Sequence, residues 1–320
     1  MKNKKIFTFS MTLLMLPLLL VSVTHAQTAE KPIIVCTTTA VGSVVEDFLD
    51  DSADVLVLVQ PGLCPADFDM KPGYVDAVSK ATILFKQNIQ GEFWLDNLLE
   101  SAGNDDLTVV AIPGVYNTPE GAKSYIRDVG GNLSQILGIN LDSETFEMIT
   151  EIDQVSTWIT TQAESLEASN LNVICMGWLK TFIESAGFNV VSTFNPPETL
   201  SAGDITGLLE TAHTEGAALI VDNLQIDTDF GGGIASQVGA EHLVLTNFPG
   251  AIPGTETLSK MLRYNAEQLF RGASTWHIAS GLKAEKINLG NQVTLYQITT
   301  VIAVVIAATE AVMLYSRKKK

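Results

Sequence analysis

The sequence predicts an α/β protein of two similar lobes, each with a mostly parallel four-stranded sheet, joined by one long rigid helix and followed by a transmembrane helix. Three observations predict this fold class. Short β-branched runs alternate with amphipathic segments, which is typical of parallel α/β sheets. Residues 142–168 contain no Gly or Pro and separate two such sets of elements. Near the C-terminus, residues 294–315 are apolar with a single charge.

The first 26 residues have the order of a secretory signal peptide. MKNKK is basic, an uncharged apolar stretch follows, and Thr24-His25-Ala26 offers a small-residue cleavage context. The sequence therefore predicts that the chain after residue 26 is exported from the cytoplasm.

Residues 32–138 are predicted to form the N-terminal α/β lobe. We expect strands at 32–38, 54–59, 81–85 and 107–112, and helices at 41–49, 73–80, 92–101 and 120–137. The linker helix is predicted within 139–168, and a helix of this length spans about 40 Å.

Residues 171–275 repeat the alternation and are predicted to form the C-terminal lobe. We expect strands at 172–176, 189–193, 217–221 and 242–245, and helices at 178–186, 203–215, 232–239 and 255–269. Ligands of parallel α/β sheets bind beyond the carboxyl ends of the strands, so the turns after these strands are the candidate site.

The C-terminal part is predicted to anchor the protein. Residues 276–293 form a membrane-proximal linker, and residues 294–316 are long enough to span a bilayer, which takes about 20 residues. Residues 317–320 are basic and should remain in the cytoplasm. The two lobes would then lie outside the cytoplasmic membrane.

The acidic balance of the chain excludes one class of partner. The net charge is −17, and proteins that bind nucleic acids contact phosphates through Lys and Arg. No nucleic-acid partner is expected. The motifs G-x-S-x-G, C-x-x-C and H-E-x-x-H are absent from the sequence, so the chain is not predicted to be an enzyme.

Several stretches carry a resemblance to a known family. They are VQPGLCPADFD (59–69), DAVSKATILFKQNIQGEFWLDNLLES (76–101), NTPEGAKSYI (117–126), VDNLQID (221–227) and TLSKMLRYNAEQL (257–269). With these, residues 33–270 resemble the metal-receptor class of ABC-transporter solute-binding proteins, which capture zinc or manganese outside the cell. The resemblance implies two lobes joined by a rigid helix, a ligand site between them, and an ABC permease as partner.

The metal ligands of the family are not retained at the matching positions. Residues without imidazole or carboxylate stand there: Ala66, a position near Gly114, Met176 or Gly177, Asn223, and Thr246 or Asn247. Asp67, Phe68 and Asp69 of the first turn do match the family. The four histidines, His25, His213, His242 and His277, fit no ligand position and are expected to be surface or packing residues.

Three interpretations of the site remain open. In the first, Cys64, Cys175 and Met176, with an aspartate, hold a soft metal ion such as zinc or copper. In the second, Cys64 and Cys175 form a disulfide. In the third, an enlarged pocket accepts an organic or chelated ligand held by Trp178, Tyr116 and Asn side chains.

The full set of expected site residues lies in turns of both lobes: Cys64, Ala66, Asp67, Gly114, Cys175, Met176, Asn223 and Asn247. The expected function is that of a membrane-tethered receptor that passes a metal or small-molecule ligand to an ABC permease. The alternative is a surface interaction or scaffold protein that keeps the receptor fold without a ligand.

Overall fold

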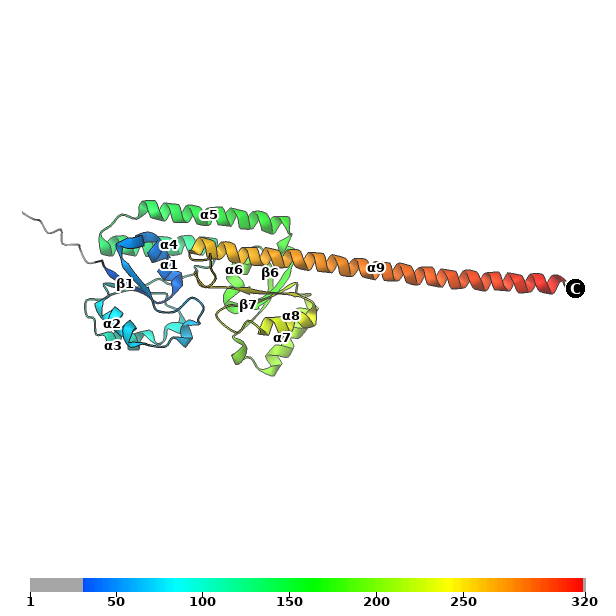
Figure 1. Ribbon diagram of the computed structural model, residues 1–320, viewed down its shortest axis with the longest axis horizontal. Helices are drawn as coiled ribbons and strands as arrows, with labels where there is room; N and C mark the ends of the chain where they lie inside the picture. Colours follow the sequence, from blue (N-terminus) through cyan, green and yellow to red (C-terminus); the bar gives the residue numbers. More distant parts are fainter. Residues whose placement is uncertain (1–30, 319–320) are drawn as a thin grey trace, which may run out of the picture. The chain divides into compact units, whose positions relative to one another are not determined.

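The computed structural model describes residues 31–318 of the chain. The predicted signal peptide, residues 1–26, lies outside the described residues and stays a prediction. Strands and helices alternate through the N-terminal lobe (Figure 1). They are β1 (Ile33–Cys36), α1 (Thr39–Leu49), β2 (Asp54–Val57), α2 (Pro72–Lys80), β3 (Ile83–Lys86), α3 (Leu95–Ala102), β4 (Thr108–Ala111) and α4 (Pro119–Leu137).

The C-terminal lobe follows the long helix α5 (Asp142–Ser165) and has the same alternation. Its elements are β5 (Asn172–Met176), α6 (Lys180–Ser185), β6 (Asn189–Phe194), α7 (Ala202–Thr214), β7 (Leu219–Asn223), α8 (Phe230–Val238), β8 (Glu241–Leu245) and the start of α9 (Leu258–Lys318).

Both sheets are parallel throughout, as predicted. The strand order is β2-β1-β3-β4 in the first sheet and β6-β5-β7-β8 in the second. Within a sheet, each strand reaches the next strand along the chain through a helix, which parallel pairing requires. All carboxyl ends of a sheet therefore lie along one edge, and the turns that follow them gather there.

The hydrophobic core is continuous between the lobes. Ile34 and Val35 of β1 are both fully buried, and successive side chains of a strand point to opposite faces. Val35 packs in a cluster with Leu84 and Leu98. Ile34 belongs to a second, larger cluster that continues into the C-terminal lobe. The lobes thus share apolar packing in addition to the linker.

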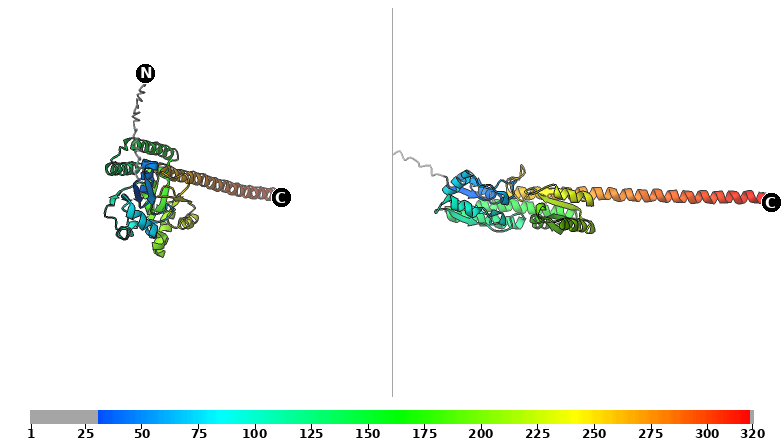
Figure 2. Two further views of the ribbon diagram at one scale, coloured as in Figure 1. Left: turned by 60° about the vertical axis from the view of Figure 1, so that its left-hand side comes forward. Right: turned by 90° about the horizontal axis from the view of Figure 1, so that it is seen from below.

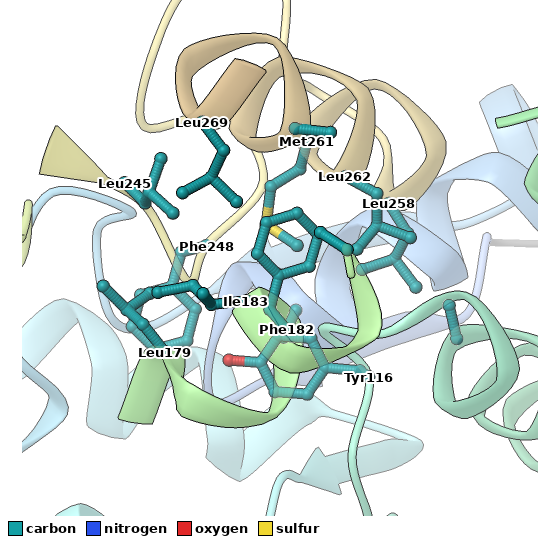
Figure 3. Close-up of a cluster of buried hydrophobic side chains, with 14 of the residues drawn as sticks. Tyr116, Leu179, Phe182, Ile183, Leu245, Phe248, Leu258, Met261, Leu262 and Leu269 are labelled. Atoms are coloured by element: carbon teal, nitrogen blue, oxygen red, sulfur yellow. The ribbon is translucent and has the colours of Figure 1, made fainter. Parts of the chain in front are cut away.

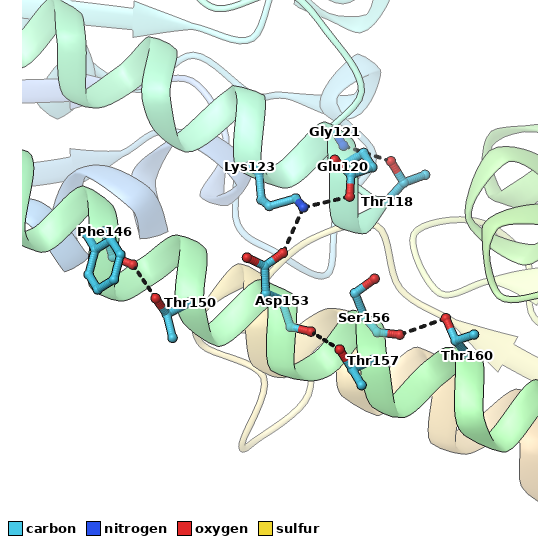
Figure 4. A network of polar contacts seen from close by, with 10 residues as sticks. All are labelled: Thr118, Glu120, Gly121, Lys123, Phe146, Thr150, Asp153, Ser156, Thr157 and Thr160. Atoms are coloured by element: carbon cyan, nitrogen blue, oxygen red, sulfur yellow. Dashed lines mark hydrogen bonds and ion pairs between the residues drawn. The ribbon is translucent and has the colours of Figure 1, made fainter.

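Helix α5, predicted within residues 139–168, packs along α4 as well as connecting the lobes. Lys123 of α4 lies 2.8 Å from the carboxylate of Asp153 on α5 and 2.6 Å from Glu120 on its own helix (Figure 4). Helix α5 lies along both α4 and the first turns of α9 (Figure 1), and α9 then runs away from the lobes as one long helix (Figure 2). The linker is therefore one member of a helical layer.

Helix α9 continues without a break from Leu258 to Lys318. The sequence divides this region into a closing helix, a linker at 276–293 and a span at 294–316, whereas the structure has one helix. Its start is held on α5, because the Arg263 guanidinium lies 3.4 Å from the centre of the Trp158 ring. The helix is long and apolar enough to cross a membrane, with a mean hydropathy of 2.0 in its most apolar window.

Acidic side chains meet where α1, α5 and α9 pack together. Partial burial, with the nearby carboxylates of Glu151 and Glu46, raises the pKa of Asp47 to about 6, while Lys260 acts in the opposite direction. Glu151 also accepts a hydrogen bond of 2.9 Å from the Ser259 hydroxyl. This junction is therefore sensitive to pH.

Candidate functional site

A cavity of about 700 Å³ lies between the two lobes. Its walls come from turns that follow β2, β3 and β4 in one lobe and β5, β7 and β8 in the other. This is the edge where parallel α/β sheets bind their ligands. The lining comprises residues 64–66, 87–91 and 114–117 of the N-terminal lobe and Trp178, Thr181, Asn223, Gln225, Asn247 and Phe248 of the C-terminal lobe.

The turn after β2 is held against the cavity by aromatic packing. The indole Nε1 of Trp94 donates to the carbonyl oxygen of Pro65 at 2.8 Å, and the Trp94 ring stacks on Phe68 with centroids 3.9 Å apart. Gly91 approaches closely, since a Cβ there would lie 3.1 Å from Pro65 and 3.2 Å from the backbone nitrogen of Ala66. These contacts fix the positions of Cys64 and Ala66 on the wall.

The buried carboxylate of Glu92 shapes the neighbouring wall, residues 87–91. Its Oε1 accepts from the Thr37 hydroxyl and from the Gln87 backbone N–H at 3.0 Å, and its Oε2 accepts from the Ile89 N–H at 3.1 Å. Asn88 between them adopts φ of 62°, in the left-handed region. Glu92 therefore holds a tight turn whose residues line the cavity.

Gln225 connects the two lobes by a side-chain hydrogen bond. Its Nε2 donates to the carbonyl oxygen of Pro61 at 2.8 Å and to the Thr246 hydroxyl at 2.9 Å. Its Oε1 accepts from the Asn247 backbone N–H at 3.1 Å. Its own backbone N–H donates to Oδ1 of Asn223 at 3.0 Å. The amide of Gln225 is therefore fully used.

A second polar contact between the lobes lies at Asn117. Its Nδ2 donates to Oδ1 of Asn247 and to the carbonyl oxygen of Trp178, both at 3.2 Å. In the described part of the chain, Nδ2 of Asn223 is buried without a hydrogen-bond partner. Asn223 thus contributes to the cavity wall a buried amide donor that makes no hydrogen bond.

Tyr116 supplies the apolar contact between the lobes. It is 8% exposed and belongs to the same buried cluster as Phe182, and the other residues labelled in Figure 3 all come from the C-terminal lobe. Burial raises the pKa of the Tyr116 phenol, although a hydrogen bond with Gln87 acts in the opposite direction. The phenol is therefore neutral in the physiological range.

The structure brings five of the eight predicted site residues to the cavity: Cys64, Ala66, Gly114, Asn223 and Asn247. Trp178 and Tyr116, named for an organic ligand, also line it. Gly114 has φ of 132°, where a side chain would be strained, so the backbone at this position does not favour a histidine.

The other three predicted residues lie elsewhere. Asp67 is outside the lining, and Cys175 and Met176 are 0% and 1% exposed in the core of the C-terminal lobe. The soft-metal set of Cys64, Cys175 and Met176 is therefore not assembled at the cavity. Both residues belong to strand β5, which ends at Met176 as predicted, and both side chains pack inside the sheet layer and not in the turn that follows.

The cysteines are all free thiols, and the structure lacks the disulfide considered for Cys64 and Cys175. Burial raises the pKa of the Cys175 thiol to about 12. Cys36 is likewise buried in its strand, as its sequence position predicts. Cys64 is the partly exposed thiol of the three.

The three histidines within residues 31–318 do not line the cavity. His242 instead lies 2.7 Å from Oδ2 of Asp222, which also accepts from the Gly231 N–H at 2.8 Å. This pair fastens the start of α8 to β7 and β8. His213 lies on α7 and His277 on α9, and His25 is outside the described residues.

Sequence reasoning missed the amides Gln87, Asn117 and Gln225, and the carboxylate Glu92. Gln225 lies inside the quoted VDNLQID stretch, which carries the family resemblance and is therefore a usable signal. Glu92 lies inside another quoted stretch. Its role depends on backbone groups that fold around it, which no local pattern reveals.

The donor set of the cavity does not fit zinc or manganese. Such ions take imidazole and carboxylate ligands, with thiolate for zinc. Among residues 31–318, no group of three or more His, Cys, Asp or Glu side chains is placed to hold a metal ion. Partial burial raises the pKa of the Cys64 thiol, and the ligand form of Cys is the thiolate. One protonated thiol among neutral side chains is a poor site for a dication.

Comparisons with known proteins agree with this fold. The family of the zinc-uptake complex component A, periplasmic (ZnuA), matches residues 34–272. A Mn-bound periplasmic metal binding protein from Candidatus Liberibacter asiaticus superimposes with a TM-score of 0.66 at 13% identity, covering 76% of this chain and 100% of that one. A crystal structure of ZnuA gives 0.64 at 17% identity with the same coverage. No curated protein sequence matches the chain.

The match extends over most of the chain and includes both sheets and the connecting helix. The quoted turns, the two parallel sheets and the inter-lobe cavity all agree with it. The chain therefore belongs to the ZnuA family, within the metal-receptor class of ABC-transporter solute-binding proteins.

Proposed function

We propose that this protein is a membrane-tethered, extracytoplasmic solute receptor that captures a ligand between its lobes and passes it to an ABC permease. The observation that carries this proposal is the cavity of about 700 Å³, which turns of both lobes build together. A site divided between two lobes allows a ligand to change the equilibrium between open and closed arrangements. The role is a binding role and not an enzymatic one.

Helix α9 supports the tethered part of the proposal. Its residues 281–317 are exposed and include a long apolar stretch, as expected of a helix that is covered by lipid. In sequence, Arg317 and the lysines after it form a basic cluster, which would favour the cytoplasmic side. A stop codon after Val293 should release the protein from membranes, whereas the full chain should resist a carbonate wash.

The uptake role is tested by blocking the cavity. Ala66 lines the cavity on an exposed stretch of the turn, so Ala66→Trp should fill the space with little cost to the core. Leu63→Trp, on the same turn but outside the lining, is the matched control. A deletion strain carrying each variant is grown in defined medium, and every medium component, metals included, is measured as it is depleted.

A receptor predicts that one component remains in the medium with the deletion and with Ala66→Trp, and is depleted normally with Leu63→Trp. If depletion is the same in all strains, the receptor proposal fails. A phenotype that depends on the protein but is unaffected by Ala66→Trp would instead favour the scaffold role.

A further inference from the structure

We infer that the ligand of the inter-lobe cavity is an uncharged organic molecule that presents an acceptor oxygen to Asn223 and an apolar or aromatic face to Trp178. This inference rests on the proposed receptor function and names the class of its ligand. It differs from the metal ions bound by the solved relatives, and three features of the cavity support it.

The first feature is the absence of charge in the wall. None of the residues that line the cavity is Asp, Glu, Lys, Arg or His. A charged group that leaves water without an opposite charge or metal ligand loses far more solvation free energy than neutral donors return. The wall therefore favours a neutral ligand over an anion or a cation of the same size.

The second feature is the unused donor of Asn223. The residue is 1% exposed and lines the cavity, and its Nδ2 has no partner within the described residues. The orientation of the amide is fixed, because its Oδ1 accepts the backbone N–H of Gln225 at 3.0 Å. A buried donor without a partner is unfavourable, and a ligand oxygen that reaches it would satisfy it. An amide N–H₂ cannot coordinate a metal, so this group requires an acceptor atom.

The third feature is the size and apolar character of the space. A cavity of about 700 Å³ lies within the range of about 300–1,000 Å³ that organic ligands occupy. Trp178, which is 48% exposed, lies on its wall with Val115 and Ile89. A bare dication would occupy only a small part of this volume, since its ligands lie about 2 Å away.

The test uses a matched set of probes on the full chain in lipid nanodiscs. N,N-dimethylbenzamide is neutral and has an acceptor oxygen without a donor, benzoate is its anionic counterpart, and benzylammonium is its cationic counterpart. Zinc and manganese chloride are the metal probes. Binding is followed by ¹⁹F NMR of protein labelled with 5-fluorotryptophan. The Trp178 resonance is assigned with Trp178→Phe, and the other tryptophans report folding.

We expect the benzamide to shift the Trp178 resonance and to bind about tenfold more tightly than either ion, because the neutral wall desolvates charge at a cost. Asn223→Asp replaces the donor by an acceptor of the same shape, so benzamide binding should weaken about tenfold and benzylammonium binding should strengthen. Asn97→Asp, on the exposed face of α3, should change the affinity for neither the benzamide nor benzylammonium. If Asn223→Asp is unfolded, Asn223→Ala removes the donor without adding charge and should also weaken the benzamide.

Three results would overturn the inference. One is stoichiometric binding of zinc or manganese that shifts Trp178, which would leave the receptor function intact with a metal as ligand. Another is a preference of the wild type for benzoate or benzylammonium. The third is no binding of any probe, and the uptake experiment with Ala66→Trp then decides separately whether the receptor proposal survives.

Discussion

Glu92 offers the sharpest test of how the cavity is built. Glu92→Ala removes the acceptor of the Gln87 and Ile89 backbone N–H groups, whose bonds of 3.0 and 3.1 Å hold the turn that lines the cavity. Glu92 is 7% exposed, so water does not readily replace it. The Gln87 N–H also donates to the Thr37 hydroxyl at 3.1 Å, so only the Ile89 N–H is left without an acceptor, which costs about 1–3 kcal/mol. The Thr37 hydroxyl can rotate and is not counted.

A loss of this size is measurable as a change in the free energy of unfolding. A protein of this size loses about 2–4 °C in Tm per kcal/mol, so we expect a decrease of about 6 °C. Urea unfolding of the full chain in detergent, followed by tryptophan fluorescence, gives the same quantity independently. Trp94 is two residues away and stacks on Phe68, so its fluorescence should report a local loss of structure around residue 92.

Two variants complete this experiment. Glu100→Ala changes an exposed glutamate on α3 and should leave stability within about 0.5 kcal/mol of the wild type. Glu92→Gln keeps one acceptor oxygen, so its free energy of unfolding should lie between those of the wild type and Glu92→Ala. If Glu92→Ala unfolds at the same urea concentration as Glu100→Ala, the carboxylate does not hold this turn.

Three further predictions concern the lobes, the thiols and pH. Gln225→Ala removes the bond to Pro61, so the distance distribution between spin labels on the two lobes should broaden; an unchanged distribution would mean that this bond does not hold the lobes. One thiol per native chain should react with iodoacetamide, and this reaction should be absent in Cys64→Ser. At pH 8 the thiol should react more slowly than free cysteine, because the pKa of Cys64 is raised. A second reactive thiol would contradict the burial of Cys36 and Cys175. Asp47 has a raised pKa of about 6, so its contribution to stability is present below its unfolded pKa and is lost as pH rises through about 6. Asp47→Asn should therefore raise the Tm at pH 7 and not at pH 4, and an equal effect at both values would refute the pKa shift.

Much of the fold follows from local patterns that the sequence displays directly. The run at 32–38 and its seven counterparts are short, apolar and β-branched, and each recurs after a helical segment. This alternation specifies parallel pairing, because a parallel connection needs a crossover helix. The continuity of α9 was not predicted. Gly281 and Gly290 lower helix propensity by only about 1 kcal/mol each, which the remaining residues of the helix outweigh.

The site was predicted less completely, for a physical reason. A turn can be located from the end of a strand, and Ala66, Gly114 and Asn247 are found where the turns predict them. The end of β5 was predicted correctly at residue 176, but Cys175 lies within that strand and not in the turn after it, and its side chain packs in the core. Gln225 and Pro61 are 164 residues apart, so their contact exists only once both lobes are folded.

The unbroken course of α9 fixes how the receptor meets its surroundings. The stretch 276–293 is helical, so with the anchor proposed above it would hold the lobes about 27 Å above the bilayer at 1.5 Å per residue, where a flexible chain would allow many heights. Because α9 begins in the core of the C-terminal lobe, that lobe would keep one orientation relative to the proposed anchor. Closure of the cavity around a ligand would then move only the N-terminal lobe. Under the proposed function, the protein would meet a permease by lateral diffusion in the same membrane, at a constant height and with the same face toward it.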